Sequence, residues 1–373
     1  MSLNSKDKVF VHPKDAPYNI KEKLYENLSS KEEANYKKVL EYFSDSGLKL
    51  GVKENAGEKD NELGLSSIEK MWLSRDCMMR YLRACNLDVD ETIKRLKSSI
   101  VWRRSFGISN GIYGEEFLKN LGIFEIINHE NVIKPEVVKG ENETGKQLIF
   151  GYDKENRPLL YLFNEKENTE GSHRQVEFLI FMLEIIIDYM PLNVDKLGLC
   201  VDFKKFPGVG LKKKKNPSVK LMKEILSILQ YHYPERLGLA AFYEIPILVN
   251  VLLKICYPFV DPYTKKKCHF GEEFGEFIGS DQLITLYKGG SVDFEYNHEI
   301  YWEALIKNGQ SKKRLQYRNF NRLGGKIGLT EFDLKAETPE RLSININSTM
   351  KANPDQIFEK EYEVVEGEVT AAR

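Results

Sequence analysis

Short apolar stretches alternate with amphipathic ones between residues 147 and 245, and this alternation restricts the fold more than any other feature. Four stretches are predicted as strands: Gln147–Tyr152, Pro158–Phe163, Leu197–Phe203 and Leu239–Ile245. Two are predicted as helices from apolar residues spaced three and four apart: Ser172–Met190 and Val219–Tyr231. This order is typical of β-α-β units in a parallel sheet. The sequence therefore predicts an α/β fold for this part of the chain.

Helical patterns dominate the region before the sheet. The predicted helices are Lys31–Phe43, Ser67–Ala84 and Val89–Phe106. Asp88 suits the amino-terminal cap of the third helix, and Gly107 suits its end, because these residue types satisfy the free backbone groups at helix termini. The segment Asp45–Gly64 is rich in Gly, Asn, Lys and Glu and is predicted to be a linker.

Composition excludes several classes of protein. The 373 residues include 55 Lys and Arg and 56 Asp and Glu, so a globally basic nucleic-acid-binding protein is not expected. Apolar runs are shorter than the ~20 residues that a membrane span needs, and the polar first ten residues do not resemble a signal peptide. The five cysteines lack C-x-x-C spacing, so we expect reduced thiols in the cytoplasm and no zinc site.

Enzyme motifs are missing from the sequence, and two basic stretches remain to be explained. Neither G-x-S-x-G nor a phosphate-binding loop is present, so no catalytic residue is predicted. The cluster Lys212–Lys215 suits a solvated loop or contact with anionic lipid. Seven basic residues between Ala304 and Thr330 suit either membrane contact or a structural helix around the domain. From about Ala336 the chain lacks periodicity and is predicted to be a poorly ordered tail.

The segment Ile247–Val260 is apolar on nearly all sides of a helix. Such a helix is either buried in a core or moves between a ligand and a membrane, and it is too short to span a bilayer. Polar motifs flank it. By spacing alone, Glu235 and Arg236 suit surface charges, and the turn after Asp261 suits a simple helix cap.

Several motifs together resemble the CRAL-TRIO lipid-transfer family, and specifically its fungal phosphatidylinositol transfer proteins. The stretches that carry this resemblance are Arg80–Ala84, Trp102–Arg104 with Phe106-Gly107, Tyr233–Gly238, and Pro258–Pro262 with Thr264 and Lys267. Flanking stretches are similar to the fungal branch linked to azole tolerance, or pleiotropic drug resistance: Glu141–Lys146, His173–Val176, Tyr296–His298 and Gly324–Leu329.

The resemblance implies a particular architecture. A helical N-terminal domain precedes a lipid-binding domain with a five-stranded, mostly parallel sheet, an apolar pocket and a gating helix. The implied division is 1–64 for an N-terminal extension and linker, 65–132 for the helical domain, 133–300 for the lipid-binding domain and 301–373 for a C-terminal extension with a disordered tail.

The resemblance also implies a non-enzymatic protein that binds phosphatidylinositol and exchanges it between membranes. A sterol is the implied second ligand, and no cofactor or metal is implied. The implied headgroup residues are Glu235, Lys267, Thr264 and Arg236. The implied gate residues are Leu248, Val249, Leu252, Leu253, Ile255 and Phe259. One departure is visible: Cys85 and Asn86 stand where relatives often carry a basic residue, so a headgroup contact from the helical domain is not expected.

Partners and location follow from the same resemblance. We expect a monomer, since a gate must remain free, with transient contact to anionic membranes and no nucleic-acid partner. The expected location is the cytoplasm with peripheral membrane association, at the endoplasmic reticulum, lipid droplets or cell periphery. An alternative role is a lipid sensor that presents phosphatidylinositol to a lipid kinase or synthase.

Overall fold

The computed structural model describes most of the chain. The described residues are 8–12, 16–17, 24–25, 27–53, 62–124, 127, 132–206, 208, 219–247, 250–251 and 262–336. All of them belong to one compact unit, Met1–Glu337. Over these residues, every helix is too short or too polar to cross a membrane. The lysines at 212–215, the six predicted gate residues and the predicted tail after Ala336 lie outside the described residues.

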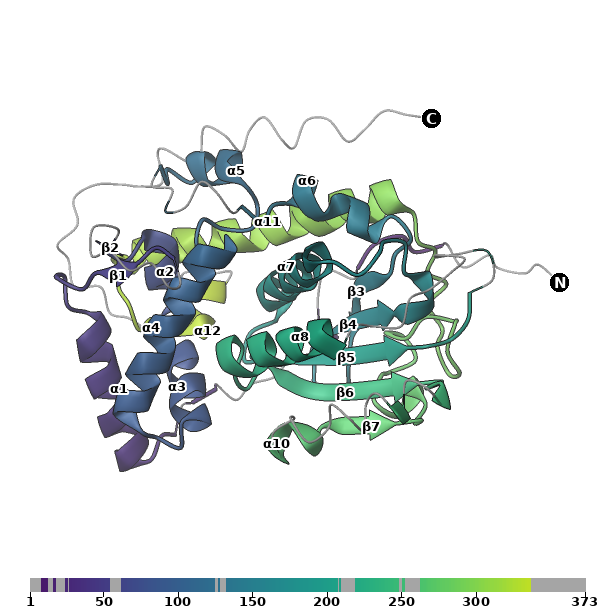
Figure 1. Cartoon of the computed structure of the whole chain (residues 1–373), viewed down its shortest axis with the longest axis horizontal. Coiled ribbons are helices and arrows are strands. Elements are labelled where there is room, and N and C mark those ends of the chain that lie inside the picture. Colours follow the sequence, from purple (N-terminus) through teal and green to yellow (C-terminus); the bar gives the residue numbers. More distant parts are fainter. Residues whose placement is uncertain are drawn as a thin grey trace. The chain divides into compact units, whose positions relative to one another are not determined.

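A five-stranded sheet lies beside the N-terminal helices in the compact unit (Figure 1). Its strands, in spatial order, are β3 (Gln147–Tyr152), β4 (Pro158–Phe163), β5 (Leu197–Asp202), β6 (Leu237–Tyr243) and β7 (Cys268–Phe270). β3 and β4 pair antiparallel, while the pairs from β4 to β7 are parallel. The prediction of an α/β fold with a five-stranded, mostly parallel sheet is therefore confirmed.

Two helices connect the parallel strands as the apolar spacing predicts. They are α7 (His173–Tyr189) and α8 (Val219–His232). α7 packs against β3, β4 and α8, and α8 also contacts the helical region through α4 (Val89–Phe106). The short edge strand β7 was not predicted, because three residues after a run of lysines give no period-two signal.

The helical region before the sheet has a small core of its own. It contains α1 (Ser30–Phe43), α2 (Ser67–Trp72), α3 (Arg75–Ala84) and α4. Val39 of α1, Leu82 of α3 and Leu96 of α4 are fully buried in one cluster. As predicted, Asp88 caps α4 by accepting a hydrogen bond from the Glu91 amide at 2.9 Å, and Gly107 ends it with a φ of +88°.

Two predictions in this region are corrected. The expected single helix Ser67–Ala84 breaks after Trp72, because the Ser74 hydroxyl accepts a hydrogen bond from the Cys77 amide and starts a new helix. The expected linker contains two short paired strands, β1 (Leu50–Gly51) and β2 (Glu62–Leu63). The buried Arg104 guanidinium stabilises them by donating to backbone carbonyls of both strands.

The remaining elements complete the compact unit. They are α5 (Glu115–Asn120), α6 (Pro135–Val138), the 3-10 turns Lys139–Asn142, Asn164–Lys166 and Phe274–Glu276, α10 (Pro262–Lys265), α11 (His298–Arg322) and α12 (Glu331–Lys335). α11 packs against α7 and α12 and buries Tyr301, Trp302 and Leu305 (Figure 1). Six of the seven basic residues, from Lys307 to Arg322, lie in this helix, as one of the two predicted alternatives expects, and Lys326 lies beyond its end.

Candidate lipid site and the buried charges beside it

One face of the sheet is filled by aromatic side chains. In parallel strands, residues that are paired in register lie on the same face. Tyr161, Cys200 and Ala241 form one such row, and all three are buried. The ring of Tyr161 contacts Phe274 at 6.0 Å and Tyr287 at 6.1 Å between centroids. This face is therefore part of the packed core.

The opposite face carries two apolar rows that are only partly covered by the described residues. The first row is Leu160, Leu199, Ala240 and Cys268, and the second is Leu162, Val201, Phe242 and Phe270. We call these residues the apolar rows. The second row is half-buried up to Phe242, whose ring stacks on Phe270 at 4.9 Å, and Phe270 is 44% exposed. A continuous apolar floor of this kind suits an apolar ligand.

Three of the predicted headgroup residues lie at the edge of the sheet where β6 and β7 begin. Glu235 precedes β6 by two residues, and Lys267 immediately precedes β7. Thr264 lies in α10, and its carbonyl accepts a hydrogen bond from the Lys267 amide at 3.0 Å. The Lys267 carbonyl in turn accepts from the Ala240 amide at 2.8 Å. Because β6 and β7 are parallel neighbours, these residues share one edge beside the apolar rows.

The register also limits the separation between Glu235 and Lys267. Ala240 pairs with Cys268, so the position before it, Leu239, stands beside Lys267. Glu235 lies four residues before Leu239, which spans at most roughly 14 Å of chain. The register therefore keeps the two backbone positions near each other, at the same end of neighbouring strands.

Glu235 has an unusual backbone conformation. Its φ of +62° lies in the left-handed region, where a residue with a side chain costs on the order of 1 kcal/mol. It sits in the turn between α8 and β6, where the Arg236 amide donates to the Tyr233 carbonyl and the Leu197 amide donates to the Arg236 carbonyl. Such a conformation persists only where neighbouring contacts fix it.

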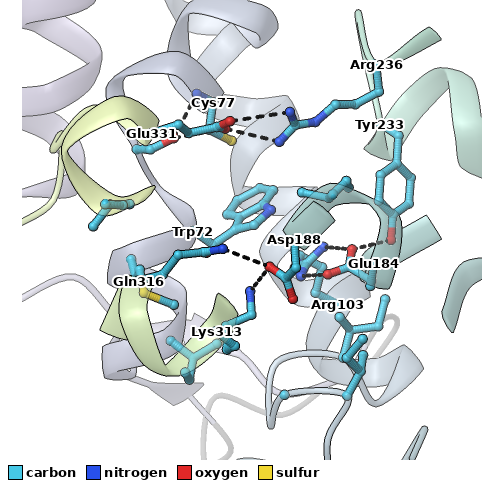
Figure 2. Close-up of a pocket in the computed structure, with 18 of the residues that line it drawn as sticks. Trp72, Cys77, Arg103, Glu184, Asp188, Tyr233, Arg236, Lys313, Gln316 and Glu331 are labelled. Atoms are coloured by element: carbon cyan, nitrogen blue, oxygen red, sulfur yellow. Dashed lines mark hydrogen bonds and ion pairs between the residues drawn. The ribbon is translucent and has the colours of Figure 1, made fainter. Parts of the chain in front are cut away.

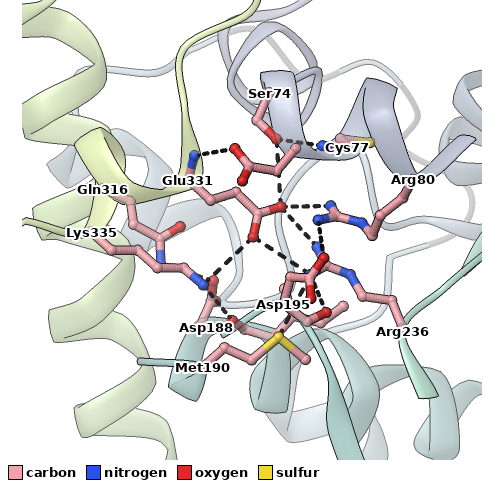
Figure 3. Close-up of polar contacts among 12 residues, drawn as sticks. Ser74, Cys77, Arg80, Asp188, Met190, Asp195, Arg236, Gln316, Glu331 and Lys335 are labelled. Carbon is pink, nitrogen blue, oxygen red and sulfur yellow. Dashed lines mark hydrogen bonds and ion pairs between the residues drawn. The ribbon is translucent and has the colours of Figure 1, made fainter. Parts of the chain in front are cut away.

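Arg236, predicted to contact the headgroup, has its guanidinium in a buried charge cluster instead. It donates to the Asp195 carbonyl at 2.9 Å and to Glu331 Oε1 at 3.1 Å (Figure 3). The same carboxylate binds Arg80 Nη2 at 2.6 Å. Burial opposes ionisation of Glu331, but the charges of Arg236, Arg80 and Lys335 outweigh it and hold its pKa well below the usual range.

A second buried pair lies on the other side of the turn. The Tyr233 hydroxyl donates to Glu184 Oε1 at 2.7 Å, and Arg103 holds both oxygens of Glu184 at 2.8 Å (Figure 2). Burial opposes ionisation of Glu184, but the Arg103 charge and the hydrogen bonds from Arg103 and Tyr233 keep its pKa below the usual range. Burial, followed by repulsion from Glu184, raises the pKa of the Tyr233 hydroxyl.

Comparison with known proteins identifies the family. The sequence matches the CRAL/TRIO domain over residues 142–289 and the CRAL/TRIO N-terminal domain over residues 35–98. It is 37% identical over 339 residues to phosphatidylinositol transfer protein PDR17 of Saccharomyces cerevisiae, covering 90% of this chain and 91% of that protein. The chain belongs to the CRAL/TRIO family.

The matches to two other relatives cover a smaller share of those proteins. The CRAL-TRIO domain-containing protein C23B6.04c of Schizosaccharomyces pombe is 38% identical over 83% of this chain, but the match covers only 28% of that protein. Phosphatidylinositol transfer protein CSR1 of Eremothecium gossypii is 23% identical over 59% of this chain and 48% of that protein.

A cavity of about 100 Å³ lies between the helical region, α7 and the C-terminal helices of this CRAL/TRIO chain. Trp72, Asp188, Lys313 and Gln316 are among the residues around it (Figure 2). Neither Glu235 nor Lys267 lines it, but Tyr233, Pro234 and Arg236 of the turn that carries Glu235 do. Among the described residues, no group of three His, Cys, Asp or Glu side chains is arranged to hold a metal ion.

Sequence reasoning missed the partners that fix the 233–236 turn. Glu331 pairs with Arg80 across 251 residues, and Glu184 pairs with Arg103 across 81 residues. Local spacing does not encode such distant pairs. One signal was present: Thr330 followed three residues later by Asp333 is a helix-start pattern, and Thr330 does cap α12.

Proposed function

We propose that this CRAL/TRIO protein binds phosphatidylinositol and moves it between membranes without covalent chemistry. The observation that carries the proposal is the placement of Glu235, Thr264 and Lys267 at one sheet edge, where Lys267 directly precedes Cys268 of the apolar rows. The names of the relatives PDR17 and CSR1 as phosphatidylinositol transfer proteins support it.

The apolar rows suit the acyl chains. Two acyl chains contain about 30 methylenes, and shielding each from water is worth about 0.8 kcal/mol, so a carrier must hide on the order of 25 kcal/mol of apolar surface. An exposed groove cannot do this, and a floor with a lid is needed. We assign the floor to the apolar rows. We assign the lid to the predicted gate residues Leu248, Val249, Leu252, Leu253, Ile255 and Phe259.

The charged edge suits the headgroup. A buried phosphate is costly unless it is paired and hydrogen-bonded, and Lys267 supplies the charge with Thr264 as a hydroxyl donor. The Glu235 carboxylate accepts hydrogen bonds, so its partner is a donor such as an inositol hydroxyl. Choline has no hydroxyl or N–H donor. This set therefore favours phosphatidylinositol over phosphatidylcholine.

A sterol is the proposed second ligand. It needs an apolar floor and one polar partner for its hydroxyl, so it would use the apolar rows and compete with phosphatidylinositol. We further propose that the protein works as a cytoplasmic monomer that touches anionic membranes only during exchange. Presentation of phosphatidylinositol to a lipid kinase or synthase is the alternative role.

A vesicle transfer assay tests this function. The intact chain should move labelled phosphatidylinositol faster than labelled phosphatidylcholine between vesicles. The double substitution Glu235→Gln with Lys267→Ala should lower phosphatidylinositol transfer at least tenfold and affect phosphatidylcholine less. The control Lys266→Ala removes the exposed neighbouring lysine and should leave both rates unchanged.

Two outcomes would contradict this proposal. Equal wild-type rates for the two lipids would overturn the headgroup assignment. Negligible transfer, together with a large increase in the output of a lipid kinase added to the same vesicles, would favour the presenting role over the carrier role.

A further inference from the structure

The turn that carries Glu235 is anchored on both sides by buried side chains. Tyr233, two residues before it, is 7% exposed, and Arg236, directly after it, is 8% exposed. Glu235 itself is half-buried and holds a left-handed backbone conformation. A glutamate in that conformation returns to ordinary backbone angles unless its neighbours are held in place. The contacts of Tyr233 and Arg236 therefore hold the backbone on either side of Glu235 in place.

The first anchor leads into the helical region. Tyr233 donates to Glu184 of α7, and both Glu184 oxygens are held by Arg103 of α4. Figure 2 shows Tyr233 and Arg103 approaching Glu184 from different elements. We call Tyr233, Glu184 and Arg103 the tyrosine anchor. A two-pronged arginine pair fixes the orientation of the carboxylate as well as its position.

The second anchor joins three segments that are distant in sequence. Arg236 binds Glu331 of α12, and Glu331 binds Arg80 of α3 (Figure 3). The amide of Glu331 also donates to Asp76 at 2.7 Å, which fixes the start of α12 against α3. We call Arg236, Glu331 and Arg80 the arginine anchor. Burial of its side chains keeps water from replacing these partners.

Both anchors end in arginines of sequence motifs that the proposed function did not use. Arg80 opens the motif Arg80–Ala84, and Arg103 lies in Trp102–Arg104. A purely structural buried pair also exists nearby, since Arg104 binds Glu69 within the helical region and does not reach the turn. The two anchors differ from that pair because each contacts a residue that flanks Glu235.

We propose that the helical region and α12 act as a positioning frame, which holds Glu235 toward the lipid headgroup through the tyrosine and arginine anchors. This inference rests on the proposed function and adds positioning residues to it: Tyr233, Glu184, Arg103, Arg236, Glu331 and Arg80. The consequence is that headgroup selectivity depends on segments that do not touch the lipid.

Headgroup selectivity of anchor variants tests this inference. Full-length protein is loaded from vesicles with equal phosphatidylinositol and phosphatidylcholine, and the ratio of the two bound lipids is measured. Tyr233→Phe removes one buried hydroxyl and should lower the ratio at least threefold. Glu331→Gln should do the same. A merely structural role would reduce loading of both lipids together and leave the ratio unchanged.

A matched control separates positioning from general destabilisation. The Tyr113 hydroxyl donates to Asp188 of α7 at 3.0 Å, one helical turn from Glu184. Tyr113→Phe therefore removes a comparable buried hydroxyl that has no contact with the turn, and the lipid ratio should stay at the wild-type value. In a Glu235→Gln background, Tyr233→Phe should cause no further change in the ratio, because the positioned group is already altered.

The outcomes distinguish this inference from the proposed function. If Glu235→Gln lowers the ratio but Tyr233→Phe and Glu331→Gln retain it, the positioning frame is wrong and the headgroup assignment stands. If wild-type protein shows no preference for phosphatidylinositol, both are wrong. An equal effect of Tyr113→Phe and Tyr233→Phe would also overturn the positioning frame.

Discussion

The junction between the helical region and the sheet differs sharply from the sheet face that carries the apolar rows. At the junction, arginines and carboxylates are buried in pairs, as in Arg103 with Glu184 and Arg80 with Glu331. On the sheet face, the apolar rows are uncharged and partly uncovered among the described residues, as at Val201 and Phe242. The junction fixes the positions of its side chains, while the sheet face offers an apolar surface to a ligand.

This difference follows from the physics of the two interactions. A buried charge tolerates little displacement, because it loses its partner and keeps its desolvation cost. Apolar contacts are non-directional and roughly proportional to area, so a floor made of them accepts acyl chains of different lengths. We therefore expect the charged junction and the adjacent sheet edge to determine which headgroup is bound. The apolar rows should determine which acyl chains can be held.

The largest expected effect comes from breaking a pair at the junction. Glu184→Gln leaves Arg103 buried without its counter-charge and should lower the free energy of unfolding by roughly 3–5 kcal/mol. The matched control is Glu177→Gln on the same helix, whose partner Arg174 is exposed, so that this surface pair is worth under about 1 kcal/mol. Urea unfolding measures the free energy of unfolding of both variants. Equal losses would contradict the claim that the buried pair at the junction contributes more than a surface pair.

A smaller effect separates the two faces of the sheet. Phe163 is 2% exposed on the packed face, so Phe163→Ala should cost roughly 3 kcal/mol of stability. Phe242 on the opposite face is half-buried, and Phe242→Ala should cost roughly 1 kcal/mol while reducing bound phospholipid several-fold. Thermal unfolding and lipid extraction test this. Full lipid loading of the Phe242 variant would contradict the floor assignment.

The last expected effect is a pH dependence at the junction. Burial, together with the charges of Arg103 and Arg95, lowers the pKa of His232 from 6.5 to about 3, and its ring stacks on Trp102 at 4.1 Å. As pH falls from 6.5 toward 3, the unfolded imidazole gains a proton and the folded one does not. The contribution of this group to stability is therefore complete only well above pH 6.5, and it falls by at most about 1.4 kcal/mol per pH unit below about 6.

Substitution of His232 isolates that contribution. His232→Gln removes the titrating group, so the slope of unfolding free energy between pH 6 and 4 should become shallower by about that amount. Chemical unfolding at several pH values measures the slope. An unchanged slope in the variant would show that His232 does not cause the acid sensitivity of the junction.

Local signals predicted much of the fold, since they depend on residues close in sequence. The helix Val89–Phe106 was predicted with its observed bounds because Asp88 and Gly107 mark its ends. The break within the predicted helix Ser67–Ala84 was missed, since the apolar pattern continues through it and the Ser74 cap outweighs that pattern locally.

The candidate site was harder to predict from the sequence than the fold. Glu235, Thr264 and Lys267 came from a resemblance of motifs, and the parallel register then brought them to one edge. The structural role of Arg236 was missed because its partner Glu331 lies 95 residues away. Pairing of this kind depends on how the helices pack on the sheet, and hydrophobic periodicity does not predict it.

The most direct test is native mass spectrometry with lipid extraction on full-length protein purified from a eukaryotic host. Wild-type protein should carry phosphatidylinositol, and the double variant Glu235→Ala with Lys267→Ala should lose it while remaining folded and able to load sterol. Wild-type protein that carries no phosphatidylinositol, or a double variant that retains it in full, would contradict the headgroup site at this sheet edge.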